Sequence, residues 1–497
     1  MVFIKEQDTV LKKQLSLFDL IVFGIGSTIG AGIFILIGLG ASVTGPGIII
    51  SFILGTLISL FIALNYAELS TSIPTAGGSY SFVKEGLGGM VAFYVGWLIW
   101  LGSVVYSALS TVGFVQYLNF IYPLPFPDLI GILILLGFAF LNMKSFTKAM
   151  FAQKIITLIL LAIFILSIVT GSMNLDIKKF SPLFPKGISS IFVGTSLIFV
   201  CFIGFAMLTT VSEEAKEPKN IGYALIASVL IPGLIYIGIC VVTIGSVPIN
   251  VLINSKVPLM ELVKDNLILT GLMLLAAILA TLSSLNVSII AASRNLFALS
   301  RDGYLPKIFS SVQREYKTPH IAMLFSALIA VLFVASRSIE FITYLSTFGY
   351  TFAFSLVSSS LFILRKKRRY LERPFKIPYY KFFTLVGFVL PLFLIPFLER
   401  SAIFIGVVWM IVGFFVYCLH ALGVDRFRMA FGGINIFICI LSFTVWYSLN
   451  IGFSSMQPLT KILISYLSLI IGVICLITGI LFIKKIKIPK REEKSQI

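Results

Sequence analysis

The chain has 497 residues, of which 58% are apolar and 12% charged, and its mean hydropathy is +1.05. This composition excludes an ordinary soluble globular protein, because such a protein carries about twice that share of charged residues. The formal net charge of +18 at pH 7 also needs an explanation. We predict an all-α protein that crosses a membrane many times.

Apolar runs long enough to cross the hydrocarbon layer, which takes about 20 helical residues, recur along the sequence. A polar lead over 1–15 precedes the first run, and a basic tail over 484–497 follows the last. The predicted transmembrane helices are fourteen, over 16–41, 46–69, 88–122, 127–143, 150–171, 187–212, 220–247, 267–299, 320–336, 339–364, 381–398, 401–420, 428–450 and 461–483.

The positive charge predicts the orientation. If successive loops alternate between sides, 30 of the 38 lysines and arginines lie on the side of the N-terminus and eight on the other. Cytoplasmic loops collect positive charge, so both termini are expected in the cytoplasm. Basic clusters such as Arg365–Arg369 directly follow apolar runs and indicate anchors at anionic lipid rather than a nucleic-acid site.

Nothing in the sequence indicates an enzyme or a tightly bound metal. The cysteines lie inside predicted helices without paired or metal-ligand spacing, and the two histidines are far apart. These residues are Cys201, Cys240, Cys418, Cys439, Cys475, His320 and His420.

The first predicted helix contains four glycines in nine residues, at positions 24, 26, 30 and 32. Each glycine costs about 1 kcal/mol of helix propensity, so the cluster predicts a place where the helix opens. Opened helix ends at bilayer depth present amide groups to a carboxylate. The alternative is close helix packing through Gly26 and Gly30. A second interruption is predicted around Ile203-Gly204-Phe205 of the sixth span, and paired interruptions of this kind point to a transport site.

These segments resemble the amino acid-polyamine-organocation superfamily of transporters. The resemblance rests on five motifs in order: Gly26-Ser-Thr-Ile-Gly-Ala-Gly-Ile-Phe34; Pro74-Thr-Ala-Gly-Gly-Ser-Tyr80; Phe202-Ile-Gly-Phe205 with Glu213-Glu-Ala-Lys-Glu-Pro-Lys-Asn220; Ser300-Arg-Asp-Gly-Tyr-Leu-Pro306 after Arg294; and Arg373-Pro-Phe-Lys-Ile-Pro378. The resemblance covers about residues 15–380. The predicted number of spans is closer to the number found in the branch of cationic and broad-range amino acid transporters.

The resemblance implies a core of two inverted five-helix repeats, over 16–171 and 187–364, with discontinuous first and sixth helices. Peripheral helices are expected over 381–483. It also implies the residues of the substrate site: first-helix amides bind the substrate carboxylate, sixth-helix carbonyls bind its ammonium group, and further side chains surround the rest. The expected substrate-binding residues are Ser27, Ile29, Gly30, Ala31, Gly32, Ser103, Tyr106, Val200, Cys201, Phe202, Ile203, Asn286 and Ser288.

The predicted walls of this site carry no aspartate or glutamate, and Ala206 stands where some relatives place an acid. A cationic side chain would lack a counter-ion in a low-dielectric site, so a neutral amino acid is favoured. A polyamine or cationic amino acid exchanger or antiporter is the alternative, since cation–π contacts can replace the acid.

The resemblance also implies a sodium site as one route of coupling. Its ligands would be carbonyls and hydroxyls of Gly26, Ile29, Ala280, Ser283 and Ser284, and hard oxygen ligands suit a small hard cation. The two serines could instead bond to their own helix. Proton-coupled relatives use a fifth-helix lysine, and the resemblance places Leu160 at that position, with Lys154 too early. This departure disfavours the lysine-proton mechanism and leaves sodium coupling, uncoupled exchange or a different proton carrier.

The sequence predicts a secondary transporter working by alternating access, with no cofactor other than a coupling Na⁺ or H⁺. Its partners would be a small amino acid and membrane lipid, without nucleic acid, and its oligomeric state is open. The protein is expected to be a multi-pass protein of the cell membrane. A channel or a sensor without transport are the alternatives from other classes. Charged residues at the inner helix ends, among them Asp19, Lys84 and Asp302, could form a cytoplasmic gate.

Overall fold

The computed structural model describes residues 15–75, 77–144, 149–313, 316, 318–336, 338–421 and 473. The chain divides into two compact units, one of Met1–Asp302 with Lys307–Met410 and one of Gly303–Pro306 with Ile411–Ile497. The described part of the second unit is small, and in it the rings of Tyr304 and Tyr417 stack with centroids 5.6 Å apart. The first unit contains every residue that the sequence assigns to the substrate site.

The described residues are helical almost throughout. The predicted spans from 16–41 to 401–420 correspond to observed helices, while the spans 428–450 and 461–483 lie outside the described residues. The α-helices are α1 (Leu17–Thr28), α2 (Ala31–Thr44), α3 (Ile48–Ser72), α4 (Gly78–Leu87), α5 (Gly89–Ile121), α6 (Pro127–Lys144), α7 (Ala149–Ser172), α8 (Ser190–Ile198), α9 (Pro218–Ser246), α10 (Ile249–Asn254), α11 (Pro258–Val263), α12 (Leu267–Arg301), α13 (His320–Ala335), α14 (Ile339–Lys367), α15 (Tyr380–Phe393) and α16 (Arg400–Ala421). Short 3₁₀ segments are η1 (Gly45–Gly47), η2 (Ile177–Phe180), η4 (Lys307–Ser310) and η5 (Ile395–Phe397), and a long one is η3 (Phe199–Glu214).

Nine helices within the described residues are long and apolar enough to cross a membrane, and three shorter apolar helices accompany them. The chain is therefore a multi-pass helical membrane protein, as predicted. The count of fourteen membrane helices remains a prediction, because the last two predicted spans fall outside the described part.

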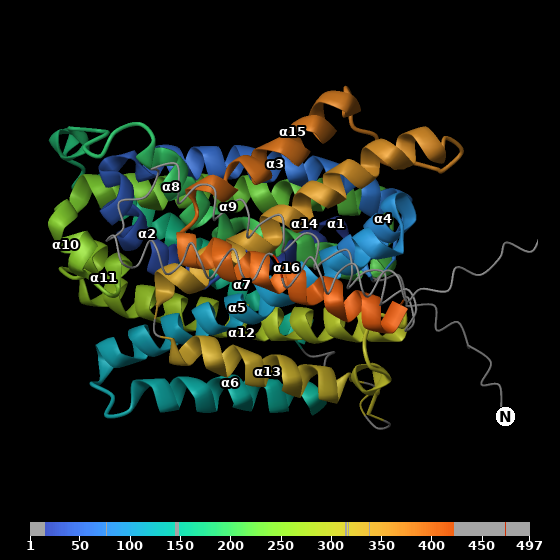
Figure 1. The fold of residues 1–497 in the computed structure, drawn as a ribbon. Helices are drawn as coiled ribbons and strands as arrows, with labels where there is room; N and C mark the ends of the chain where they lie inside the picture. The colour runs from blue at the N-terminus through green and yellow to red at the C-terminus, as the bar shows by residue number, and fades with distance from the viewer. Residues whose placement is uncertain are drawn as a thin grey trace, which may run out of the picture. The chain divides into compact units, whose positions relative to one another are not determined.

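Within the first unit, α5 and α12 pack along each other through the centre (Figure 1). The helices α3 and α9 form a second close pair, while α6 and α13 pack together at one edge. The broken first span, made of α1 and α2, contacts α9, η3, α8 and α5. This arrangement buries the glycine-rich segment among helices from distant parts of the sequence.

The first span opens where its glycines predict. Helix α1 begins at a capping box, in which Ser16 and Asp19 satisfy each other's backbone amides, and it ends at Thr28. Ile29 and Gly30 are extended, and α2 begins at Ala31. The break leaves the last carbonyls of α1 and the first amides of α2 without partners inside their own helices.

The sixth span differs from the prediction of a second interruption. Helix α8 passes directly into η3, so the described backbone stays helical but tightens to the 3₁₀ form over Phe199–Glu214. A run of sixteen such residues is long for this geometry. The narrower coil lets Gly204 lie against α1: a Cβ on Gly204 would be 1.9 Å from the Ser27 carbonyl oxygen. Close helix contact therefore replaces the expected gap.

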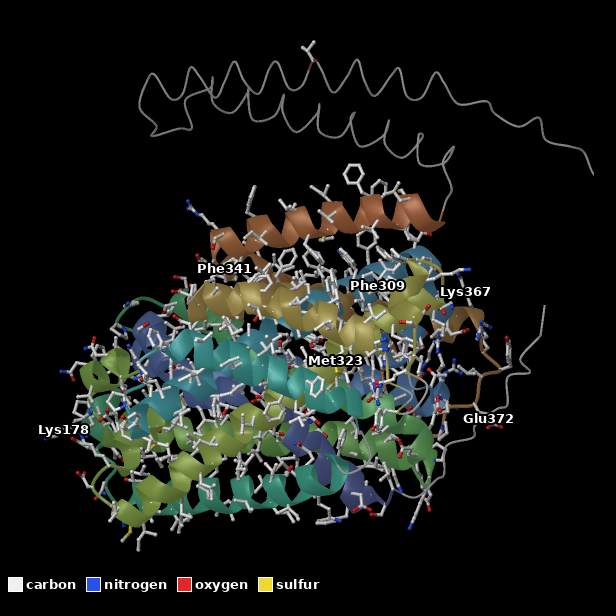
Figure 2. The ribbon with its side chains drawn as sticks, turned by 90° about the horizontal axis from the view of Figure 1, so that it is seen from below. Lys178, Phe309, Met323, Phe341, Lys367 and Glu372 are labelled. Atoms are coloured by element: carbon white, nitrogen blue, oxygen red, sulfur yellow. The ribbon has the colours of Figure 1, made fainter. Side chains whose placement is uncertain are left out.

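The two ends of the first unit carry the charged loops. Figure 2 places Lys178 at one end and Lys367 and Glu372 at the other, with an apolar middle between them. The backbone of Leu15 forms two hydrogen bonds with the residues at the C-terminal end of η3. The Leu15 amide donates to the Glu214 carbonyl at 3.0 Å, and the Lys216 amide donates to the Leu15 carbonyl at 3.0 Å. The entry to the first span is thus joined to the exit of the sixth.

Candidate substrate site

The two predicted site helices cross at two glycines. Gly204 of η3 lies on the backbone of Ser27 and Thr28, and Gly32 of α2 lies on Cys201, whose sulfur would be 2.6 Å from a Cβ added at Gly32. These residues are almost completely buried. The structure thus brings the predicted first-helix and sixth-helix residues together.

The first amides of α2 face side chains of α5 and α12. The Ala31 amide donates to the Ser284 hydroxyl at 3.2 Å, and that hydroxyl donates to Ser110 at 3.0 Å. A Cβ on Gly30 would meet the Tyr106 hydroxyl at 2.5 Å. The nearest groups around the break are therefore uncharged hydroxyls, which can exchange hydrogen bonds with a polar ligand.

Tyr236 of α9 joins both site helices, and sequence reasoning did not find it. Its hydroxyl donates to the carbonyl of Thr28 at 2.9 Å and lies 3.5 Å from the carbonyl of Cys201. The side chain is fully buried. Nothing in its local sequence distinguishes it from the other 17 tyrosines, because its role depends on partners far along the chain.

Replacing Tyr236 with Phe should weaken transport without unfolding the protein. The variant keeps the ring but loses the hydroxyl that bridges the two helices, and one buried hydrogen bond contributes about 0.5–1.5 kcal/mol, or roughly twofold to twelvefold. Initial uptake rates in proteoliposomes measure this, with Tyr223→Phe as a control because Tyr223 is 52% exposed. Equal uptake by both variants would remove Tyr236 from the site.

Of the α5 and η3 side chains predicted to surround the substrate, only some lie next to the break in the first span. Ser103 shares a hydrogen bond of 2.8 Å with Tyr350 of α14, a second tyrosine that the sequence did not single out. The ring of Phe202 packs edge-on to Tyr236, with centroids 5.5 Å apart, and touches Gly55 of α3. Phe202 therefore faces α3 and α9, whereas Tyr106 faces Gly30.

The two predicted α12 residues are placed apart from the serines at the break. Asn286 accepts a hydrogen bond of 2.6 Å from Asn142 of α6, so it faces the α6 side of α12. Ser288 bonds back to the Leu285 carbonyl at 3.0 Å. Ser284, one turn earlier, is the α12 residue that reaches the broken helix.

Two of the five residues predicted to bind sodium, Gly26 and Ser283, contact a glutamine of α7. Ser283 donates to the Gln153 Oε1 atom at 2.5 Å, and Gly26 lies against the Gln153 amide nitrogen and the Thr157 hydroxyl. The Gln153 nitrogen is buried and has no hydrogen-bond partner within the described residues. Leu160, which the resemblance places at the lysine position, is one to two turns further along the buried face. The α7 side chain that reaches α1 and α12 is thus Gln153.

Comparison with known proteins identifies the family of the chain. Residues 15–401 match the amino acid permease family. The chain belongs to the amino acid permease family. It is similar to the branched-chain amino acid permease BcaP of Bacillus subtilis, with 29% identity over 83% of this chain and 93% of the relative. It is also similar to the methylthioribose transporter of that organism, with 28% identity over 83% and 94%, and to the cationic amino acid transporter 9 of Arabidopsis thaliana, with 29% identity over 61% and 58%.

Family membership makes the permease a transporter rather than an enzyme and supports amino acid transport as its function. The match covers both site helices and ends within α16. Residues 402–497 lie beyond it.

Ion pairs join helices at one end of the permease. Asp302, directly after α12, accepts from Lys84 and Tyr80 of α4, and Lys154 of α7 pairs with Asp19 of α1 at 2.6 Å. Burial raises the pKa of Asp302, but the hydrogen bonds from Lys84 and Tyr80 outweigh it, so this pKa lies below the usual value for aspartate. Asp302 is therefore ionised at neutral pH, and its contact with α4 persists into mild acid.

A second charged cluster of the permease is buried. Glu68 at the end of α3 is completely buried, and Arg365 of α14 donates to it from Nε at 2.6 Å and from a terminal nitrogen. Arg373 lies 3.4 Å away, and the Ile377 amide donates at 2.9 Å. This glutamate binds the Arg373–Pro378 motif to α3 and α14.

Proposed function

We propose that this permease moves neutral amino acids across the cell membrane by alternating access. The observation that carries the proposal is the opened first span, whose buried helix ends lie among uncharged groups and contact η3 where Gly32 meets Cys201. Helix ends at this depth have the polarity to hold a carboxylate at amides and an ammonium group at carbonyls.

In this proposal the amides of Gly30, Ala31 and Gly32 bind the substrate carboxylate. The carbonyls of Val200, Cys201 and Ile203 bind the ammonium group. Two of these groups are engaged by hydroxyls of the protein, since Ser284 accepts from Ala31 and Tyr236 lies at Cys201. A bound substrate would replace those hydroxyls one for one, so the buried polar groups stay satisfied as it arrives and leaves.

Alternating access needs two groups of helices that move against each other. We propose that they belong to two inverted repeats, over 16–171 and 187–364, with 381–483 as peripheral helices. We further propose fourteen membrane helices and both termini in the cytoplasm. The ion pairs Lys84–Asp302 and Lys154–Asp19 then close the cytoplasmic side.

The substrate side chain is proposed to be neutral because the groups nearest the break are Tyr106, Ser284 and Cys201. A cation buried beside them would have no carboxylate to compensate it. Similarity to a plant cationic amino acid transporter favours the alternative, in which arginine or lysine is carried. Both substrate classes therefore belong in one assay.

The proposal predicts saturable, trans-stimulated uptake of a neutral amino acid by proteoliposomes, measured with a labelled panel that includes leucine, arginine, lysine and putrescine. Gly30→Val should abolish it, because the added side chain meets Tyr106 and Ser284. Gly137→Val is the control, since nothing lies within 4 Å of that glycine. Uptake of cations alone would favour the alternative substrate, and non-saturable flux would favour a channel.

The coupling ion is the second part of the proposal. We propose that Gln153 stands where a sodium ion was expected, so transport does not require sodium. The five expected ligands fit sodium poorly here: the Ser283 hydroxyl donates to Gln153, the Ser284 hydroxyl is taken by Ala31 and Ser110, and a neutral carboxamide lies on Gly26. The uncharged side-chain amide of Gln153, on α7, contacts both α1 and α12, the two helices that a bound cation was expected to join.

Uptake should therefore be equal in sodium and in N-methylglucamine buffers. Gln153→Glu should introduce sodium stimulation, because a carboxylate beside the Ser283 hydroxyl and the α1 carbonyls offers hard oxygen ligands. Glu85→Gln, an exposed change at the far end of α4, controls for the handling of the variants. Wild-type uptake that rises with sodium and falls in Ser283→Ala would restore the sodium site.

A further inference from the structure

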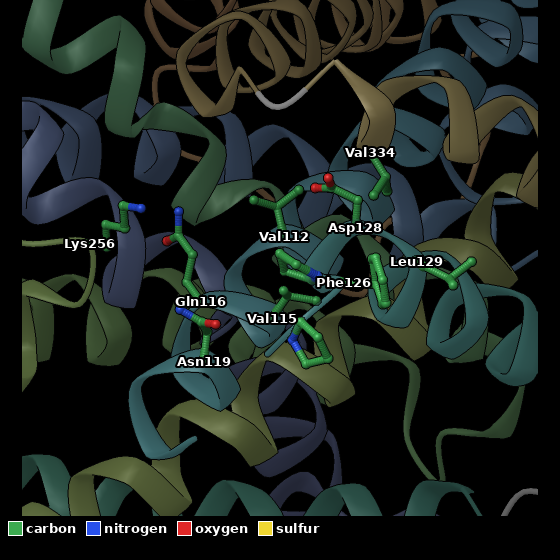
Figure 3. A pocket seen from close by; sticks show the side chains of 11 residues that line it. Val112, Val115, Gln116, Asn119, Phe126, Asp128, Leu129, Lys256 and Val334 are labelled. Atoms are coloured by element: carbon green, nitrogen blue, oxygen red, sulfur yellow. The ribbon is translucent and has the colours of Figure 1, made fainter. Parts of the chain in front are cut away.

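A cavity lies on the other side of α5 from the candidate substrate site. It is lined by the last turns of α5, the loop before α6, the start of α6, Lys256 and the end of α13, and its volume is about 590 Å³ (Figure 3). Tyr106 and Ser110 of α5 face the broken span, whereas Val112 and Gln116 face this cavity. The two sites therefore share one helix but open on different faces of it.

The cavity is amphipathic. Figure 3 shows Lys256, Gln116 and Asn119 together at one end and Leu129 and Val334 at the other. The apolar part of the wall also contains Val112, Val115, Phe126, Pro125 and Pro127, and Asp128 lies at that end. A volume of this size and a mostly apolar wall with a few polar groups are typical of small-molecule sites, which hold about 300–1,000 Å³.

The polar end offers partners for both charges of an amino acid. The Gln116 Oε1 atom is buried and lacks a hydrogen-bond partner within the described residues, which is costly unless a ligand or water donates to it. Asn119 uses its oxygen for the Leu124 amide at 2.8 Å, which leaves its amide nitrogen as a donor. The exposed Lys256 ammonium supplies positive charge beside these two amides.

We propose that this cavity is a second binding site for an amino acid with an apolar side chain. The carboxylate binds Lys256 and the Asn119 nitrogen, the ammonium group donates to Gln116 Oε1, and the side chain lies against Val112, Leu129 and Val334. The prolines around Phe126 fix the rim of the cavity before the ligand arrives. The choice of amino acid rests on the proposed function, whereas the site itself rests on the cavity.

Because α5 forms a wall of both sites, an amino acid bound in this cavity should change the affinity of the substrate site for its substrate. Such coupling is reciprocal, so filling either site changes binding at the other by the same factor. In the proposed orientation the loop before α6 lies outside the cell, so the cavity gives the permease a place where external amino acid regulates its own transport.

The test is the stoichiometry of labelled leucine binding to the full chain in lipid nanodiscs. Wild type should bind two molecules, Gly30→Val one, the double variant Gln116→Leu with Lys256→Ala one, and the combination of all three changes none. Lys178→Ala, which removes an exposed lysine that does not line the cavity, is the control and should bind two. Leucine uptake by the Gln116 and Lys256 variant should lose any dependence on leucine preincubation from that side.

Each other outcome overturns a different statement. One leucine per wild-type chain, none in Gly30→Val and one in the double variant would overturn the second site and leave the proposed function intact. This is also the result if lipid or detergent fills the cavity. Two per chain in the double variant would place the extra site elsewhere, and no leucine on wild type would overturn both proposals.

Discussion

Gly204→Ala should reduce uptake by roughly 5- to 150-fold while the protein still inserts into the membrane. The added methyl group would lie 1.9 Å from the Ser27 carbonyl oxygen and 2.7 Å from the Thr28 Cα atom. Both are backbone atoms, so no side-chain rotation relieves the contact and η3 must move away from α1. Overpacking of this kind costs about 1–3 kcal/mol, which corresponds to that range of rates.

The matched control is Gly271→Ala in α12. It adds the same methyl group to a membrane helix, but nothing lies within 4 Å of it. Initial uptake rates, normalised to the amount of protein in the liposomes, measure the effect. If Gly204→Ala transports as fast as Gly271→Ala, the close crossing of the first and sixth spans is not required for transport.

Glu68→Gln should lower the thermal stability of the detergent-solubilised protein markedly. The change leaves the guanidinium groups of Arg365 and Arg373 without their shared carboxylate in a buried position. Breaking a buried ion pair by removing one partner costs about 3–5 kcal/mol. Fluorescence-detected gel filtration after heating measures the loss as a lower midpoint temperature.

Glu85→Gln is the control for this prediction. Glu85 also pairs with an arginine, Arg368, at 2.6 Å, but both side chains are about two-fifths exposed. Exposed ion pairs contribute at most about 1 kcal/mol, so its midpoint should hardly change. Equal stability of the two variants would contradict the view that Glu68 holds the Arg373–Pro378 motif against α3 and α14.

Much of the architecture could be predicted because the bilayer imposes its own pattern. The hydrophobic runs gave the helices from 16–41 to 401–420, since a helix must hide its backbone from lipid wherever it crosses. The opening at Ile29 and Gly30 was also predictable, because glycine weakens a helix locally. The form of the sixth span was not, because a single Gly204 does not distinguish a gap from a tighter coil.

The contacts that complete the site were not predictable from local sequence. Tyr236 meets Thr28 across 208 positions, Gln153 meets Ser283 across 130, and Glu68 meets Arg365 across 297. Each is a common residue type whose importance comes from its partner. The resemblance draws attention to Leu160 of the fifth span, whereas the contact of Gln153 with Ser283 appears only in the packing of α7 against α12.

The backbone hydrogen bonds of Leu15 with Glu214 and Lys216 join the start of the first span to the end of the sixth span. Two hydrogen bonds join the strand that leads into α1 to the residues that leave η3, so neither end can swing outward alone. A force applied to the chain at Leu15 is therefore shared by both site helices. In the proposed alternating-access cycle, the step that opens this end moves the two spans together, with Gly204 and Ser27 in contact between them.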